Sequence, residues 1–148
     1  MERVTTETAV ELEEFLRAAD LTVSALDAPE VALWLQRSGG RIIASSGFEL
    51  SADGRAALIR SVAVDPAFRR SGQGTALAVW ALREAAARGA REAWLFSRRS
   101  GPFWQKLGFK RSTTLELADA LAGSAQVEHF RATGRLDGEV AWWRALPY

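Results

Sequence analysis

The chain has 148 residues, 48% hydrophobic and 25% charged, a composition typical of one globular domain with its own core. Lys and Arg total 19 against 18 Asp and Glu, so the net charge points to neither a nucleic-acid partner nor a membrane surface. The absence of cysteine excludes a disulfide scaffold, a thiolate metal site and a cysteine nucleophile. We therefore expect a single domain over residues 1–148.

The N-terminal segment argues against export. Residues 1–19 contain five glutamates, unlike a secretory signal peptide. No uninterrupted apolar run approaches the length of a membrane span. These features favour a soluble cytoplasmic protein, and nothing in the sequence calls for a metal.

The first half of the chain predicts a helix followed by an antiparallel meander. Val4 closes a short first strand. Thr5 or Thr6 caps a helix that continues to about Ala19; its apolar side is expected to be Val10, Leu12, Phe15 and Leu16. Three strand patterns follow, separated by glycine turns and by the hairpin signal Asp53-Gly54: residues 31–36, 41–50 and 56–64.

The second half changes to a helix–strand alternation. Residues 75–88 have helical periodicity and end at Gly89, and an apolar strand follows at residues 92–97. A strand–helix–strand crossover of this length makes its two strands parallel. The remaining elements are a short helix at 103–107, a strand from Phe109, a helix or helical loop at 115–131 and a last strand at 139–146. The fold class is α/β, a mixed sheet of six to seven strands with an antiparallel N-terminal meander, a central parallel pair and flanking helices.

The segment between the parallel strand and its helix predicts an anion site. It reads Arg69-Arg70-Ser71-Gly72-Gln73-Gly74 and leads into a helix N-terminus. Free backbone N–H groups and the helix dipole converge there, glycines allow close approach, and the arginines add charge. A pyrophosphate is the natural ligand. The alternative is a tight turn that needs glycine only for positive φ.

This loop, preceded by Val62-Ala63-Val64, is followed about thirty residues later by Phe103-Trp104-Gln105-Lys106-Leu107-Gly108-Phe109. The pair resembles the two signature segments of the GNAT family of acetyl-CoA-dependent N-acetyltransferases, and the resemblance extends from the first helix to the last strand. It implies the GNAT fold, acetyl-CoA as cosubstrate and no metal.

The resemblance also implies roles for particular residues. Backbone amides of the loop would bind the pyrophosphate of coenzyme A, which maps to Arg69, Arg70, Ser71, Gly72, Gln73, Gly74 and Thr75. The preceding strand would pair with the pantetheine arm, which maps to Val62, Ala63 and Val64. The residues expected beside the pantetheine and the thioester are Ser97, Ser100, Phe103 and Trp104.

The implied reaction is direct transfer, in which a neutral amine attacks the thioester carbonyl, a backbone N–H holds the oxyanion and a base takes the proton. Trp104 stands where many members have a tyrosine that can protonate the thiolate. Ser97 stands where many have an asparagine. Glu49 is the first candidate base and Ser97 the second candidate catalytic residue. The alternatives are an exposed strand position for Glu49, and His129 or a water chain as base.

Arginine residues indicate which amine substrate would accept the acetyl group. The segment 58–64 and the final third of the chain most resemble the small acetyltransferases associated with arsenic-resistance operons, which implies an arsinothricin- or phosphinothricin-like amino acid. Arginine binds a carboxylate or phosphinate bidentately. The candidate substrate-binding residues are Arg60, Ser61, Arg98 and Arg99. The alternatives are a buried salt bridge of Arg60, with Glu49 as its partner, and a solvated loop for the other two arginines.

Three functions stay open on this evidence. The first is acetylation of the amine of a small anionic molecule. The second is peptide or protein N-acetylation, which requires acidic residues that the sequence does not cluster. The third is an acyl-CoA-binding module without catalysis. Trp142 and Trp143 must face opposite sides of the last strand, so one can pack in the core while the other lines a substrate pocket or a homodimer contact.

Overall fold

The computed structural model describes residues 1–21, 23–70 and 72–147. A seven-stranded mixed sheet has the strand order β1-β2-β3-β4-β5-β7-β6. The strands are β1 (Glu2–Arg3), β2 (Val31–Ser38), β3 (Arg41–Leu50), β4 (Ala56–Val64), β5 (Glu92–Phe96), β6 (Lys110–Ser112) and β7 (Ala141–Ala145). The helices are α1 (Thr6–Ala18), α2 (Gln73–Ala87), α3 (Gly101–Lys106), α4 (Thr114–Ala120) and α5 (Ala125–Ala132), with 3₁₀ turns η1 (Pro66–Phe68) and η2 (Leu136–Gly138).

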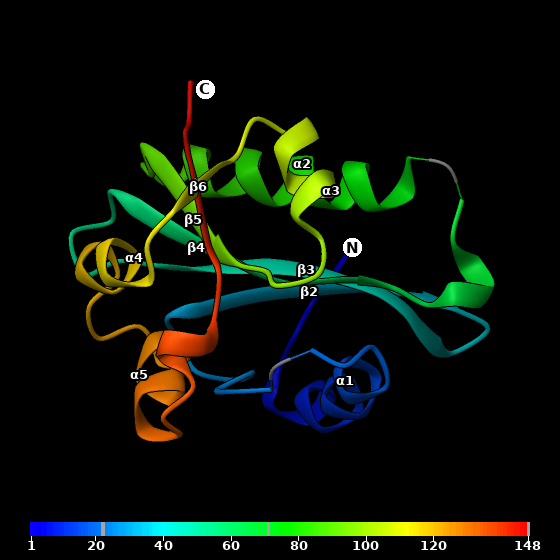
Figure 1. Cartoon of the computed structure of the whole chain (residues 1–148). Helices are drawn as coiled ribbons and strands as arrows, with labels where there is room; N and C mark the ends of the chain where they lie inside the picture. The colour runs from blue at the N-terminus through cyan, green and yellow to red at the C-terminus, as the bar shows by residue number, and fades with distance from the viewer. Residues whose placement is uncertain (22, 71, 148) are drawn as a thin grey trace.

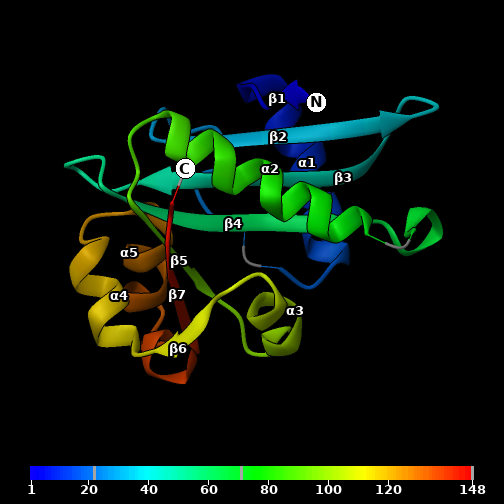
Figure 2. The same ribbon diagram turned by 90° about the horizontal axis from the view of Figure 1, so that it is seen from above.

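Helices cover both faces of this sheet. α2 and α3 lie on one face, and α1, α4 and α5 lie on the other (Figures 1 and 2). Neighbouring strand residues point to opposite faces, so Trp34 packs in the cluster with α2 while Leu33 packs in the cluster with α1. The same alternation sends Trp142 to the α2 side and Trp143 to the α4 side, as predicted.

The sheet confirms the predicted class. β2, β3 and β4 pair antiparallel, and β4 pairs parallel with β5 across the α2 crossover. Alanines on the buried side of α2 let this helix lie close to the sheet: Ala78, Ala81 and Ala85 have no exposed surface. Such small side chains leave room for the large strand residues Trp34 and Phe48 in the same cluster.

Two helices differ in detail from their predicted form. Thr5 caps α1 as expected, in a capping box with Thr8. The prediction that Val10 lies on the apolar side of this helix is wrong, because Val10 is 67% exposed and Ala9 packs inward instead. The helical region at 115–131 is divided into α4 and α5, because the second helix has its own cap, Ser124, whose side chain accepts the Val127 N–H.

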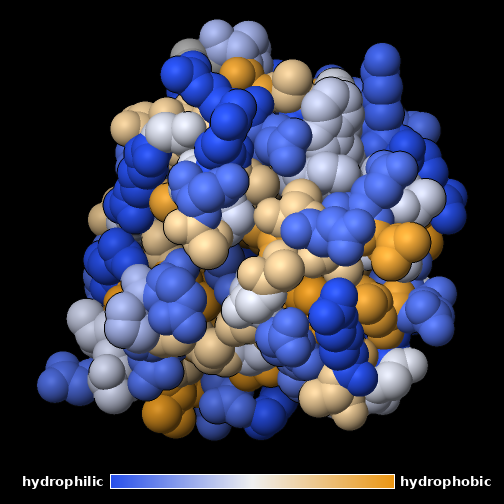
Figure 3. All heavy atoms as spheres, turned by 90° about the vertical axis from the view of Figure 1, so that its left-hand side faces the viewer, coloured by the Kyte–Doolittle hydropathy of each residue, from blue (hydrophilic) through white to orange (hydrophobic). Residues whose placement is uncertain are grey.

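The surface near α4 mixes polar and apolar residues. Figure 3 faces this side of the molecule, and apolar atoms there form small groups among hydrophilic ones. Leu115 of α4 is among the exposed large hydrophobic residues. Within residues 1–21, 23–70 and 72–147, no helix is long and apolar enough to cross a membrane.

Gly47 of β3 lies opposite Leu33 of β2, where there is no room for a side chain. A Cβ added there would lie 2.2 Å from the Ala32 carbonyl oxygen and 2.4 Å from Leu33 Cδ2. We predict that Gly47→Ala lowers the free energy of unfolding by about 3 kcal/mol, because buried backbone must move. Chemical denaturation measures this loss. Gly138→Ala is the control, since an added Cβ meets nothing within 4 Å, and an equal effect of both variants would contradict the packing.

Candidate active site

The site begins where β4 and β5 separate. In the described chain their parallel pairing runs only from Ala56↔Glu92 to Leu58↔Trp94. Beyond this point β5 still pairs with β7 through Phe96↔Ala141, and β4 still pairs with β3. The facing edges of the two central strands therefore open into a cleft, and their backbone polar groups on this side need another partner.

A bulge in β4 lies at the opening. Ser45 is opposite Ala63 and Gly47 is opposite Arg60, so β4 has one more residue than β3 in this interval. The extra residue bends the strand. Ser61 takes the strained left-handed conformation, with φ +60°, and its carbonyl accepts a 2.6 Å hydrogen bond from Ser45 Oγ. This hydrogen bond from the Ser45 side chain of β3 holds the bulge in place.

Two cavities meet at this opening, and the larger of these two, of about 440 Å³, fills the cleft between the diverging strands. It contains most of the residues that the sequence singled out for the coenzyme: Val62, Ala63, Val64, Arg69, Arg70, Gln73, Gly74, Ser97, Ser100, Phe103 and Trp104. Gly72 lines a neighbouring surface hollow, and Thr75 is exposed on the first turn of α2. Ser71 lies outside the described residues.

The N-terminus of α2 forms one end of this cavity. The helix begins at Gln73, two residues before the predicted start at Thr75, because Gly72 with φ +82° serves as its N-cap. Its first N–H groups have no partner within the helix. Arg69 Nε donates to the Val64 carbonyl at 3.3 Å, which ties the loop to the end of β4. The buried Gln73 Oε1 has no hydrogen-bond partner among the described residues.

Aromatic rings from α3 form the opposite wall. Phe103 and Trp104 contact each other edge to face, with ring centroids 4.9 Å apart, and Trp104 also contacts Phe109. Pro102 near the start of α3 and Ser100 at its cap follow directly from the end of β5. The apolar wall and the polar helix end make the cavity suited to a long ligand with an apolar arm and an anionic end.

The turn after β5 is held by hydrogen bonds that involve Ser97. Ser97 Oγ accepts the Ser100 N–H at 3.1 Å, and the Ser97 carbonyl accepts the indole N–H of Trp142 at 2.9 Å. These contacts orient the serine at the boundary between the larger cavity and a second one, because Ser97 lines both.

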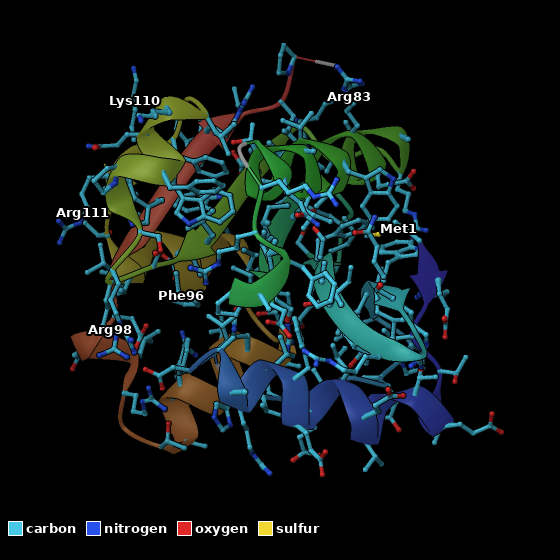
Figure 4. The ribbon with its side chains drawn as sticks, turned by 90° about the vertical axis from the view of Figure 1, so that its right-hand side faces the viewer. Met1, Arg83, Phe96, Arg98, Lys110 and Arg111 are labelled. Atoms are coloured by element: carbon cyan, nitrogen blue, oxygen red, sulfur yellow. The ribbon has the colours of Figure 1, made fainter. Side chains whose placement is uncertain are left out.

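The second cavity, of about 210 Å³, shares the bulge and the end of β5 with the first. Arg98 and Arg99 line it, as do two carboxylates that sequence analysis missed, Asp20 and Glu139. Figure 4 faces the side on which α2 begins: Phe96 lies inward, whereas Arg98 lies farther out, beside the segment that leads to β7. α5 contributes Gln126 and Phe130 to the wall.

The charged side chains of this cavity form ion pairs between segments that are distant in the sequence. Arg98 Nε lies 3.4 Å from Glu139, whose side chain is 8% exposed, and Arg99 pairs with Asp20. The Arg99 guanidinium lowers the pKa of Asp20 below its ordinary value. Arg98 and Arg99 remain 47% and 65% exposed, so both reach solvent at the cavity mouth.

Glu49 and Arg60 form a buried ion pair at the junction of the two cavities, both of which Arg60 lines although its side chain is buried. Arg60 Nη1 donates to Glu49 Oε2 at 2.8 Å, and both side chains have 0% exposure. The salt bridge is the alternative raised for Arg60 from the sequence, whereas the exposed strand position raised for Glu49 is wrong. Burial lowers the pKa of Arg60 and the Glu49 carboxylate opposes that shift. Glu49 lines neither cavity.

The family model described as "Acetyltransferase (GNAT) family" matches residues 2–109. The chain belongs to the GNAT acetyltransferase family. Both motifs quoted above, at residues 69–74 and 103–109, fall within the matched residues. A search of the curated proteins found no match.

Solved structures share the fold across the whole chain. N-acetylglutamate synthase from Neisseria gonorrhoeae, complexed with coenzyme A and N-acetyl-glutamate, matches with a TM-score of 0.75 and 16% identity, over 100% of this chain and 35% of that one. The chain thus spans about a third of the synthase. A Mycobacterium tuberculosis protein in complex with CoA and NLQ has a TM-score of 0.69 and 16% identity over 98% of both chains. Tetrahymena GCN5 has a TM-score of 0.71 and 14% identity, over 99% of this chain and 96% of that one.

Several cavity residues carried no signal in the sequence. Leu21 lines both cavities, and Gln126 and Glu139 line the second. They come from the α1–β2 loop and from the segment between β6 and β7, whose positions depend on tertiary packing. His129, an alternative base, is half-buried beside Phe130 on α5 and lines neither cavity.

Proposed function

We propose that this GNAT protein transfers the acetyl group of acetyl-CoA to the amine of a small, anionic, amino-acid-like acceptor. The observation that carries the proposal is the contact between two chemically different cavities at the splayed strands. One is long, with an apolar wall and a helix N-terminus, and the other is smaller and lined by charged residues. Two substrates that enter from different sides would meet at Ser61 and Ser97, which line both.

The larger cavity fits coenzyme A. The helix N-terminus, Arg69 and Arg70 offer N–H groups and positive charge to a pyrophosphate. The unpaired edge of β4 at Val62 to Val64 offers backbone groups to the amides of a pantetheine arm. Phe103 and Trp104 cover the apolar part of that arm. Bound acetyl-CoA supplies the activated acetyl group, and the protein's residues position it beside the second cavity.

The second cavity fits a zwitterionic amino acid with an additional acidic group. Arg98 and Arg99 provide guanidinium groups for a carboxylate or phosphinate, and Asp20 and Glu139 provide carboxylates that complement an amine. The mixture of charges favours a small zwitterion over a basic peptide, which would require a predominantly acidic groove. The resemblance to the arsenic-resistance branch suggests arsinothricin- or phosphinothricin-like amino acids within this class.

Turnover of a panel of amines tests the proposed activity. Acetyl-CoA-dependent thiol release, with mass detection of the product, should be measured for acidic amino acids, phosphinothricin, neutral amino acids, polyamines and a lysine-rich peptide. The chain has no cysteine, so the protein adds no thiol background. We expect the highest kcat/KM for the anionic amino acids. Preference for polyamines or the peptide would contradict the proposed acceptor.

A substitution at Gly74 tests where the coenzyme binds. This glycine lines the larger cavity on the first turn of α2, and an added Cβ would meet only the Phe103 ring, at 3.5 Å. We predict that Gly74→Glu weakens acetyl-CoA binding about a hundredfold, because it puts a carboxylate where the pyrophosphate would bind. Isothermal titration calorimetry measures the Kd.

Gly74→Ala is the matched control and should bind acetyl-CoA within about threefold of wild type, since 3.5 Å is an ordinary van der Waals contact. Circular dichroism confirms the fold of both variants. Wild-type affinity in folded Gly74→Glu would place the pyrophosphate elsewhere.

Arg98 and Arg99 test the acceptor site. We predict that Arg98→Gln and Arg99→Gln each raise the KM for an anionic acceptor between about tenfold and a hundredfold, as expected for loss of a charge-assisted hydrogen bond. The Kd of acetyl-CoA should not change. Arg131→Gln removes the same charge from an exposed position on α5 that lines neither cavity. An equal KM increase in this control would show that net charge alone attracts the acceptor.

A further inference from the structure

The buried pair Glu49–Arg60 connects segments that are distant in the sequence. Glu49 Oε1 accepts the Ala125 N–H at 2.7 Å, and Oε2 accepts the Gln126 N–H at 3.2 Å as well as the Arg60 guanidinium. The first N–H groups of a helix have no partner within it, and a carboxylate there also complements the helix dipole. Glu49 of β3 therefore anchors the N-terminus of α5.

Arg60 anchors two further segments. Its Nη2 donates to the Ser24 carbonyl at 2.7 Å, in the loop between α1 and β2. Its Nε donates to Ser61 Oγ at 3.3 Å, in the β4 bulge. One guanidinium thus binds β3, the bulge and the α1–β2 loop at once, using its fixed fork of donors.

The anchored segments form part of the wall of the second cavity. Gln126 and Phe130 come from α5, Asp20 and Leu21 come from the α1–β2 loop, and Ser61 is the bulge residue. Glu49 and Arg60 bond to Ser24, Ser61, Ala125 and Gln126, and no residue among 69, 70 and 72–74 of the coenzyme loop is a hydrogen-bond partner of either. The contacts of this loop run instead to the end of β4 and within its own turn.

Stabilisation of the fold does not by itself explain a buried ion pair at this position. A fully buried ion pair is often no more stable than apolar side chains of similar volume, because desolvation offsets the attraction. Apolar side chains, however, cannot hold two helix N–H groups, a loop carbonyl and a bulge hydroxyl in fixed directions. The charged side chains therefore fix the relative positions of these segments.

We propose that Glu49 and Arg60 are a positioning pair that shapes the acceptor cavity of the proposed acetyltransferase. Arg60 is among the residues that line both cavities, but both side chains have 0% exposure, so the pair acts through the segments it holds rather than by side-chain contact with a substrate. The pair sets where α5, the α1–β2 loop and the Ser61 bulge lie, and thereby which acceptors fit beside the acetyl group. Glu49 is unsuited to taking a proton from the amine, because its oxygens already accept three hydrogen bonds and it reaches neither cavity. The inference rests on the proposed function of the second cavity.

The double variant Glu49→Leu/Arg60→Met separates positioning from stability. It removes both charges, so no unpaired ion is left in the interior, and it keeps similar volume. We expect a folded protein with wild-type acetyl-CoA Kd. The kcat/KM for the acceptor should fall between about tenfold and a hundredfold, mainly through KM, because the cavity walls lose their anchors.

A second variant covers the case in which the double variant does not fold. Arg60→Lys keeps the buried charge paired with Glu49 but cannot also reach Ser24 and Ser61, so the same acceptor defect is expected with intact coenzyme binding. Arg37→Lys is the control. Arg37 pairs with Glu11 and Glu2 and lines neither of the two cavities, so its acceptor KM should stay at the wild-type value.

Wild-type acceptor kinetics in either folded variant, Glu49→Leu/Arg60→Met or Arg60→Lys, would overturn the positioning role. Amide hydrogen exchange distinguishes failure of the positioning role from failure of the proposed function. If the wild-type protein acetylates no amine, the proposed function fails and exchange alone decides the positioning role. Faster amide exchange in α5 and residues 19–26, with α2 unchanged, supports the pair as anchor. Unchanged exchange in both segments overturns it.

Discussion

The divergence of β4 from β5 is the constraint on which the site depends. Parallel strands normally continue to pair, but here the β4 bulge at Ser61 bends the strand after the Leu58↔Trp94 pair. β3 and β7 keep their pairing on the outer edges, so the sheet stays intact while its centre opens. The opening exposes strand edges to a ligand and brings two cavities into contact at Ser61 and Ser97.

The two halves of the cleft are built by different means. The half that we propose for coenzyme A is formed by segments close in the sequence: β4, its glycine loop and α2 follow one another, with α3 as the facing wall. The half that we propose for the acceptor is assembled from distant segments, which meet through charged contacts such as Arg98–Glu139 and the buried pair Glu49–Arg60.

The same difference explains what the sequence could predict. The strand periods, the glycine spacing from Gly72 to Gly74 and the crossover helix are local signals, and they located the sheet and the larger cavity. Arg60 and Glu49 stood out as charges in apolar strands, and their salt bridge was one of two interpretations. Glu139 carried no local signal, because packing alone brings its segment to the cleft. The positive φ of Ser61 was equally hidden, since serine has no special preference for it.

A crystal structure with coenzyme A and an acetylated acceptor tests the account most directly. It should show the pyrophosphate at the N-terminus of α2 and the thiol between the diverging strands. The acceptor should lie in the second cavity, near Arg98 and Arg99. Coenzyme bound outside the cleft between β4 and β5, or central strands paired along their full length, would contradict it.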